Sequence, residues 1–109
     1  DWKLLKTMLI CGTISGREVD KFKEAKLTPE KAAKLLKAPK IKECLGAIEC
    51  ALIDKVPVGD HIMFLGEVVY AEAEEDFFQN GFWNTEKAEL IYHIGGNRFM
   101  KSSPSEEVK

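Results

Sequence analysis

The sequence predicts a single, mainly β domain with short helices, and three observations lead to that fold class. The chain has 109 residues, enough for one domain, with 45% hydrophobic and 31% charged residues, an ordinary globular balance. Its most apolar and β-branched stretch, residues 46–74, predicts two strands joined by a tight connection. A further strand, a glycine turn at Gly95-Gly96 and a short return strand follow near the end of the chain.

Apolar residues recur at helical spacing near the start: Trp2, Leu5, Met8 and Leu9. They predict a short helix over residues 1–10, with Gly12 just past its end. Residues 12–16 are a predicted loop, and a second helix is predicted from about Glu18.

Ser15-Gly16 followed by Arg17 and Lys21 is open to two interpretations. Backbone N–H groups at a helix start, together with two cations, suit an anion site. The same residues also suit a helix N-cap with solvated charges, and the residue pattern alone favours this second interpretation.

A third helix is predicted to begin at Thr28-Pro29-Glu30, which offers an N-cap, a proline at the first helical position and an acid in the first turn. Pro39 would end this helix. The alternative is one short turn followed by an extended stretch over residues 35–41, and periodicity does not decide between the two.

Within residues 46–74, strands are predicted at 48–56 and 61–74, with a turn at 56–60 built on Pro57 and Gly59. Residues 62–69 are apolar on both faces, so both faces are expected to be covered. A bend or bulge is expected at Gly66, as at the corner of a barrel.

Residues 75–86 combine acids with aromatic side chains around an Asn80-Gly81 turn. They predict either a loop folded back over the barrel end or a surface for a partner. Strands are predicted at 88–94 and 98–101, followed by a disordered polar tail at 102–109.

Composition excludes several classes of protein. A net charge of −2 and an isoelectric point near 5.7 do not show the positive charge that binding to DNA or RNA requires. No apolar run reaches the length of a membrane span. The N-terminus lacks a secretory pattern. Three cysteines without paired spacing (Cys11, Cys44 and Cys50) predict small core residues in a reducing cytoplasm, with no metal site.

Four segments, in order and at sensible spacing, resemble the flavin reductase-like, FMN-binding split-barrel proteins, and in particular their flavoredoxin-like members. They are the CGTISGREVDKF segment at 11–22, KAP with two Glu-Cys pairs at 37–50, GDH with FLGEV at 59–68, and LIY with GGNRF at 90–99. The resemblance covers nearly the whole chain. It implies a split β-barrel over residues 1–101 that lacks the N-terminal strands of the family.

The resemblance also implies a function and a site. Such proteins bind FMN at a homodimer interface, and many transfer hydride from NAD(P)H to the flavin, while others carry electrons. Ser15, Gly16, Arg17, Asp20 and Lys21 would face FMN or NAD(P)H, with Asp20 orienting a basic group. His61, which the sequence alone makes a structural residue beside Asp60, would lie nearest the flavin ring in an orienting role.

The chain starts at Asp1, so we expect either a piece of a longer flavoprotein or a short member completed by another chain. Open strand edges predict a homodimer or larger assembly. The alternative function is a non-catalytic, oligomerising β domain that has lost the flavin site, with residues 77–83 as its interaction surface. NAD(P)H-dependent flavin oxidoreductase activity stays open.

Overall fold

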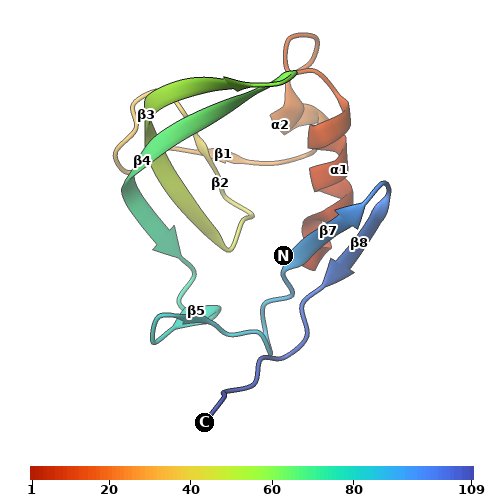
Figure 1. Ribbon diagram of the computed structural model, residues 1–109, viewed down its shortest axis with the longest axis vertical. Helices are drawn as coiled ribbons and strands as arrows, with labels where there is room; N and C mark the ends of the chain where they lie inside the picture. The colour runs from red at the N-terminus through yellow and green to blue at the C-terminus, as the bar shows by residue number, and fades with distance from the viewer.

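The computed structural model describes all 109 residues and is mainly β, with two short α-helices (Figure 1). The elements in chain order are η1 (Trp2–Leu4), α1 (Leu5–Thr13), α2 (Lys21–Glu24), β1 (Pro29–Glu30), β2 (Lys40–Ile41), β3 (Gly46–Val58), β4 (His61–Ala73), β5 (Phe78–Gln79), β6 (Phe82–Trp83), β7 (Ile91–Gly95) and β8 (Arg98–Lys101). No helix is both long enough and apolar enough to span a bilayer.

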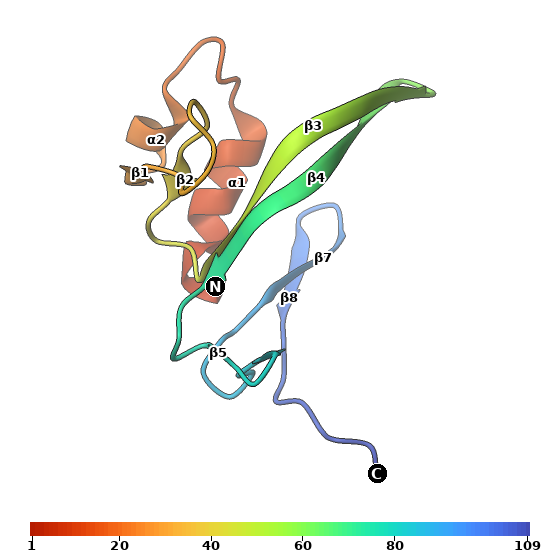
Figure 2. The same cartoon turned by 90° about the vertical axis from the view of Figure 1, so that its left-hand side faces the viewer.

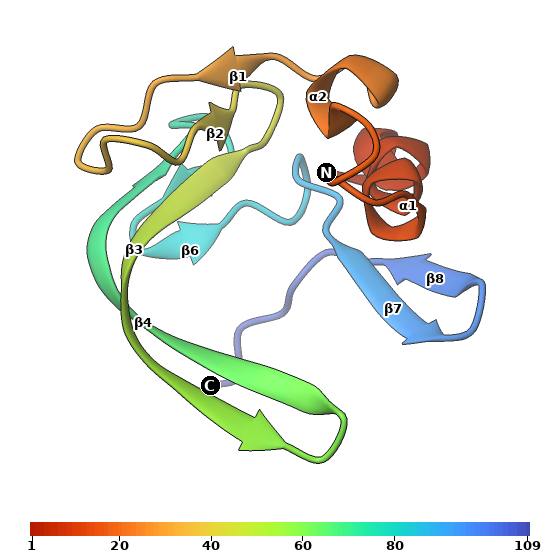
Figure 3. The ribbon, with the colours of Figure 1, turned by 90° about the horizontal axis from the view of Figure 1, so that it is seen from above.

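The strands form four separate antiparallel pairs: β1–β2, β3–β4, β5–β6 and β7–β8. No strand of one pair forms a ladder with a strand of another, so this chain does not close the barrel that the resemblance implied. Seen from above, the long β3–β4 hairpin curves along one side, with α1 and β7–β8 across from it (Figure 3). Both outer edges of that hairpin lack a backbone partner within the chain, so they are open strand edges.

The β3–β4 hairpin confirms the two strands predicted for residues 46–74 but shortens their turn. Val58 pairs with His61, so only Gly59 and Asp60 form the turn, and Gly59 adopts a φ of 60°. Pro57 was predicted in the turn, but it lies in β3 opposite Ile62.

Register shifts bend the hairpin near Gly66, as expected. Ile53 is unpaired between the Leu52 and Asp54 pairings, and Val69 is unpaired on the other strand. A Cβ at Gly66 would lie 2.9 Å from Cys50 Cβ, so the glycine permits close approach of the two strands.

The core of the chain is small, and the expectation that both faces of residues 62–69 are covered is wrong for this chain. Only Ala25, Ala32, Ala88 and Glu49 are buried, whereas Phe64 is 62% exposed and Val68 57% exposed. Among the cysteines, Cys11 and Cys44 are half-buried, but Cys50, expected in the core, is exposed.

The N-terminal helices differ in their bounds from the prediction. Helix α1 continues to Thr13 and includes Gly12, and the Thr13 hydroxyl donates to the Leu9 carbonyl at 2.9 Å. Helix α2 begins at Lys21 rather than Glu18, because the Asp20 carboxylate caps it by accepting from the Phe22 and Lys23 N–H groups.

The helix predicted from Thr28 is wrong. Pro29–Glu30 forms β1 and pairs with β2, and residues 31–39 between them are irregular, closer to the extended alternative. Carboxylates from elsewhere in the chain hold this segment: Glu43 accepts from the Thr28 N–H at 3.0 Å, and Glu49 accepts from three N–H groups further on, which a helix would pair with its own carbonyls. Tertiary contacts thus override a sound local signal.

The C-terminal third keeps the predicted turns but changes some bounds: residues 75–86, predicted as a loop, include the β5–β6 hairpin, and the strand predicted at 88–94 is β7, which begins at Ile91. Asn80-Gly81, both with positive φ, form the two-residue turn of the β5–β6 hairpin, where the Phe78 and Trp83 rings meet edge to face at 5.2 Å. Strands β7 and β8 pair across Gly96-Asn97. The tail carries no regular element, although the Ser105 N–H donates to Thr85 Oγ1 at 2.8 Å, and disorder of residues 102–109 stays a prediction.

Candidate functional site

The loop between α1 and α2 holds the residues predicted to face a cofactor, but two of them already have partners. Lys21 Nζ donates to the Cys11 carbonyl oxygen at 2.6 Å, and so satisfies a carbonyl in the last turn of α1. The Asp20 carboxylate caps α2 through the Phe22 and Lys23 N–H groups. One oxygen of the carboxylate thus serves the helix cap, and the orientation of a basic side chain by Asp20 stays a prediction.

Arg17 is the free cation of this loop. Its side chain is exposed and forms no ion pair. Its backbone N–H donates to Ser15 Oγ at 3.2 Å. A Cβ at Gly16 would meet Lys21 Cε at 3.6 Å, an ordinary contact, so the glycine is not sterically required. Arg17 thus remains available to an anionic group.

His61 lies at the tip of the β3–β4 hairpin, where its side chain is 83% exposed. Its Nδ1 lies 2.6 Å from Asp60 Oδ1, so its partner is the neighbouring carboxylate. The tip of β3–β4 is well separated from the loop between α1 and α2 (Figure 2). Within one chain, the structure does not bring His61 and Arg17 together.

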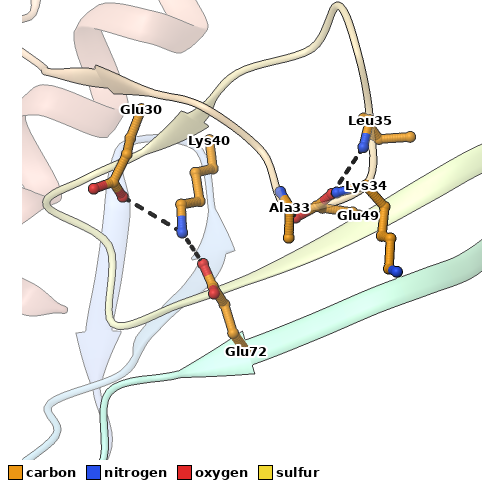
Figure 4. Close-up of polar contacts among 7 residues, drawn as sticks. All are labelled: Glu30, Ala33, Lys34, Leu35, Lys40, Glu49 and Glu72. Atoms are coloured by element: carbon orange, nitrogen blue, oxygen red, sulfur yellow. Dashed lines mark hydrogen bonds and ion pairs between the residues drawn. The ribbon is translucent and has the colours of Figure 1, made fainter.

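A charged groove that the sequence did not single out lies where β1 and β2 cross the base of β3–β4. Lys40 forms an ion pair with Glu72 and a second one with Glu30 at 3.4 Å (Figure 4). The Lys40 side chain is only 19% exposed, and its hydrogen bond to Glu72 raises the pKa of the ammonium above its ordinary value. The groove has a volume of about 280 Å³. The two ion pairs of Lys40 connect the β1–β2 pair to the central hairpin.

Glu49 is a buried carboxylate that holds the loop between β1 and β2 (Figure 4). It is 4% exposed and accepts hydrogen bonds from the N–H groups of Ala33 at 2.8 Å, Lys34 at 2.7 Å and Leu35 at 3.1 Å. Burial opposes ionisation, but the three N–H donors outweigh it and keep the pKa of Glu49 below its ordinary value. An irregular loop is thereby held in one conformation.

Neither Lys40 nor Glu49 was a candidate from the sequence. The position of Glu49 between Ile48 and Cys50, in the most apolar stretch, could have predicted a hydrogen-bonded carboxylate, since a buried acid requires hydrogen-bond partners. No local sequence pattern predicted the ion pairs of Lys40, because Glu30 and Glu72 are far from each other in the sequence.

We expect the stability of the fold to fall as pH drops through the acid range. The folded-state pKa values of both Glu49 and Glu43 lie below the ordinary value of 4.5, the latter through hydrogen bonds from Thr28, first from its side chain and then from its backbone N–H. Their stabilisation is therefore present above pH 4.5 and is lost as the pH falls through the lowered pKa values. Urea unfolding between pH 7 and pH 3 measures this, and a Glu43→Gln, Glu49→Gln double variant should show a flatter dependence. Equal slopes in the two proteins would contradict it.

The flavin reductase like domain matches residues 5–98 of this chain. Two uncharacterized proteins are each 37% identical to it over 101 residues. The protein of Aquifex aeolicus (strain VF5) matches across 92% of this chain and 51% of its own length, and that of Archaeoglobus fulgidus across 93% and 56%. The chain thus spans about half the length of the relatives it matches.

Solved structures share the fold. Nitrilotriacetate monooxygenase component B from Bacillus cereus superposes with a TM-score of 0.83 at 22% identity, covering 99% of this chain and 56% of that one. Flavoredoxin of Desulfovibrio vulgaris (Miyazaki F) superposes with a TM-score of 0.81 at 22% identity, covering 97% and 57%. The arrangement of open strand pairs is therefore similar to part of the split-barrel flavin reductases. On the match over residues 5–98, the chain belongs to the flavin reductase like domain family.

Proposed function

We propose that this chain is part of an FMN-binding flavoprotein that transfers electrons or hydride between NAD(P)H, or a redox partner, and the bound flavin. The observation that carries the proposal is the match to the flavin reductase like domain over residues 5–98, which includes the loop with the unpaired Arg17. A flavin accepts and donates hydride or single electrons, while the protein binds and orients it.

The residues of this chain fit one end of FMN. The exposed guanidinium of Arg17, which has no ion pair, suits a phosphate group. Lys21 and Asp20 have partners in α1 and α2, so the cationic contribution falls to Arg17. The isoalloxazine ring needs an enclosed apolar site, and His61 at the exposed hairpin tip does not supply one.

Completion of the ring site by further polypeptide is therefore part of the proposal. Apolar side chains of the β3–β4 hairpin are exposed in this chain, among them Ile62, Phe64 and Val68. A second copy or additional segment that covered them would bury apolar surface and enclose a ligand at once. A homodimer and a cytoplasmic location also stay predictions.

The alternative function is a non-catalytic, oligomerising β domain. It is favoured by Phe82, which is 75% exposed at the β5–β6 turn although the neighbouring Phe78 and Trp83 rings pack together. Under this alternative the chain self-associates without taking up flavin.

Titration with FMN, followed by quenching of its fluorescence, tests the proposal. We expect the chain, at a concentration at which a second copy completes the ring site, to bind FMN, and Arg17→Ala to weaken the affinity about tenfold, the value of one charge-assisted hydrogen bond. Arg98→Ala is the matched control, because Arg98 is also exposed and without an ion pair but lies on β8. No quenching by the unaltered chain, or equal weakening by the two variants, would count against FMN binding at this loop.

A further inference from the structure

Positive charge in this chain is concentrated in one segment. Residues 21–42 contain eight lysines and two glutamates, although the whole chain has a net charge of −2. Lys21 and Lys40 have polar partners within the chain, whereas Lys23, Lys26, Lys31, Lys34, Lys37 and Lys42 are exposed and form no ion pair. Flavin binding as proposed above uses none of these six.

Three of the six lie in the irregular segment between β1 and β2, here named the lysine loop (residues 31–39). Within it, Leu36 is 96% exposed and lies between Lys34 and Lys37. A hollow of about 190 Å³ beside it is lined in part by Leu35, Leu36 and Pro39. The loop therefore offers one apolar side chain and a small recess, surrounded by lysines.

The loop is also held in place before any partner arrives. Glu49 accepts the N–H groups of Ala33, Lys34 and Leu35, which lie immediately before Leu36 (Figure 4). Fixing a loop in advance lowers the entropy cost of binding. Leu36, at 96%, is the most exposed large apolar side chain of the chain.

We propose that the lysine loop is a docking surface for a protein partner with an acidic surface. Leu36 would enter an apolar recess of the partner that lies between the partner's carboxylates. Complementary charge steers association, while a buried apolar anchor supplies specificity. The contact is small, so binding is weak, fast and sensitive to salt.

The chemistry of the loop favours a protein over other polyanions. It contains neither an aromatic side chain for stacking on bases nor an arginine for bidentate phosphate contacts. One exposed leucine is too little apolar surface to hold a loop on a lipid membrane. The proposal stands on the loop alone and does not depend on flavin binding.

The test uses two fluorescein-labelled peptides of equal length, one of glutamates only and one of glutamates with two central leucines, in anisotropy titrations. We expect the leucine-containing peptide to bind more tightly, and Leu36→Ser to weaken it about tenfold while leaving the all-glutamate peptide unchanged. Replacing Lys31, Lys34 and Lys37 by glutamine should weaken both peptides about tenfold.

The matched control replaces Lys3, Lys6 and Lys87, which are exposed and carry the same total charge, by glutamine. This variant should bind both peptides nearly as the unaltered chain does. Equal loss in the two triple variants, or no effect of Leu36→Ser, would overturn the proposal.

Two further results would overturn it in favour of another partner. Tighter binding of a single-stranded oligonucleotide than of either peptide would assign the loop to nucleic acid. A change of oligomeric state in the lysine-loop variant, seen by light scattering, would assign it to a second copy of the chain. Circular dichroism of each variant checks that the fold is retained.

Discussion

Replacing Glu49 by alanine is expected to lower the melting temperature by about 10 °C, the largest effect of any single side chain here. The carboxylate is 4% exposed and accepts three backbone N–H groups, which no other side chain of the chain contacts. Its removal leaves those donors without partners and frees residues 31–39. Thermal unfolding followed by circular dichroism measures the shift.

Two controls separate this role of Glu49 from the loss of a negative charge. Glu67→Ala removes a carboxylate from an exposed position on β4 and should leave the melting temperature within about 2 °C. Glu49→Gln keeps an acceptor oxygen and should fall between the two. A melting temperature for Glu49→Ala equal to that of Glu67→Ala would show that the loop is held by something other than this carboxylate.

Gly46→Ala is expected to destabilise the fold by about 1–3 kcal/mol, the usual cost of forcing a methyl group into a filled space. A Cβ at this position would lie 2.9 Å from the Glu72 carbonyl oxygen and 3.3 Å from Trp83 Cη2. The first of these is a backbone atom in the paired strand and cannot move aside cheaply. Urea denaturation of the two proteins at pH 7 gives the difference.

Gly12→Ala is the opposite case and serves as the control. Gly12 lies within α1, and a Cβ there meets no atom within 4 Å. Alanine should stabilise the helix by about 0.5–1 kcal/mol, because glycine loses more conformational freedom on folding. If both glycine variants changed stability in the same direction, packing at Gly46 would not explain its effect.

The sequence predicted best those elements whose causes are local. The apolar, β-branched residues of 46–74 and Gly59 were enough to predict the β3–β4 hairpin, and Asn80-Gly81 was enough for the turn between β5 and β6, because such turns require positive φ. The family, too, was correct, since four short motifs in order carried the resemblance and residues 5–98 match it.

The failures came where a distant residue decided the local structure. Thr28-Pro29-Glu30 has every local feature of a helix start, yet Glu49 takes the N–H groups of residues 33–35, which a helix would pair with its own carbonyls, and pairing with Lys40–Ile41 makes a strand. At the candidate site, too, contacts between residues distant in the sequence limited what could be predicted. Arg17 is exposed and its contact with a cofactor stays a prediction, while the partners of Lys21 and Asp20 and the separation of the hairpin tip that carries His61 depend on the folded chain.

The pairing of strands only within hairpins has a consequence for how the chain folds. Each of β3–β4, β5–β6 and β7–β8 joins neighbours in the sequence, and hairpins of this kind form on a microsecond time scale. The bond from the Trp2 N–H to the Glu89 carbonyl oxygen, at 2.8 Å, spans most of the sequence instead. Because closing so long a loop is costly in entropy, we expect docking of the N-terminal helix onto the last third of the chain to be a late step of folding.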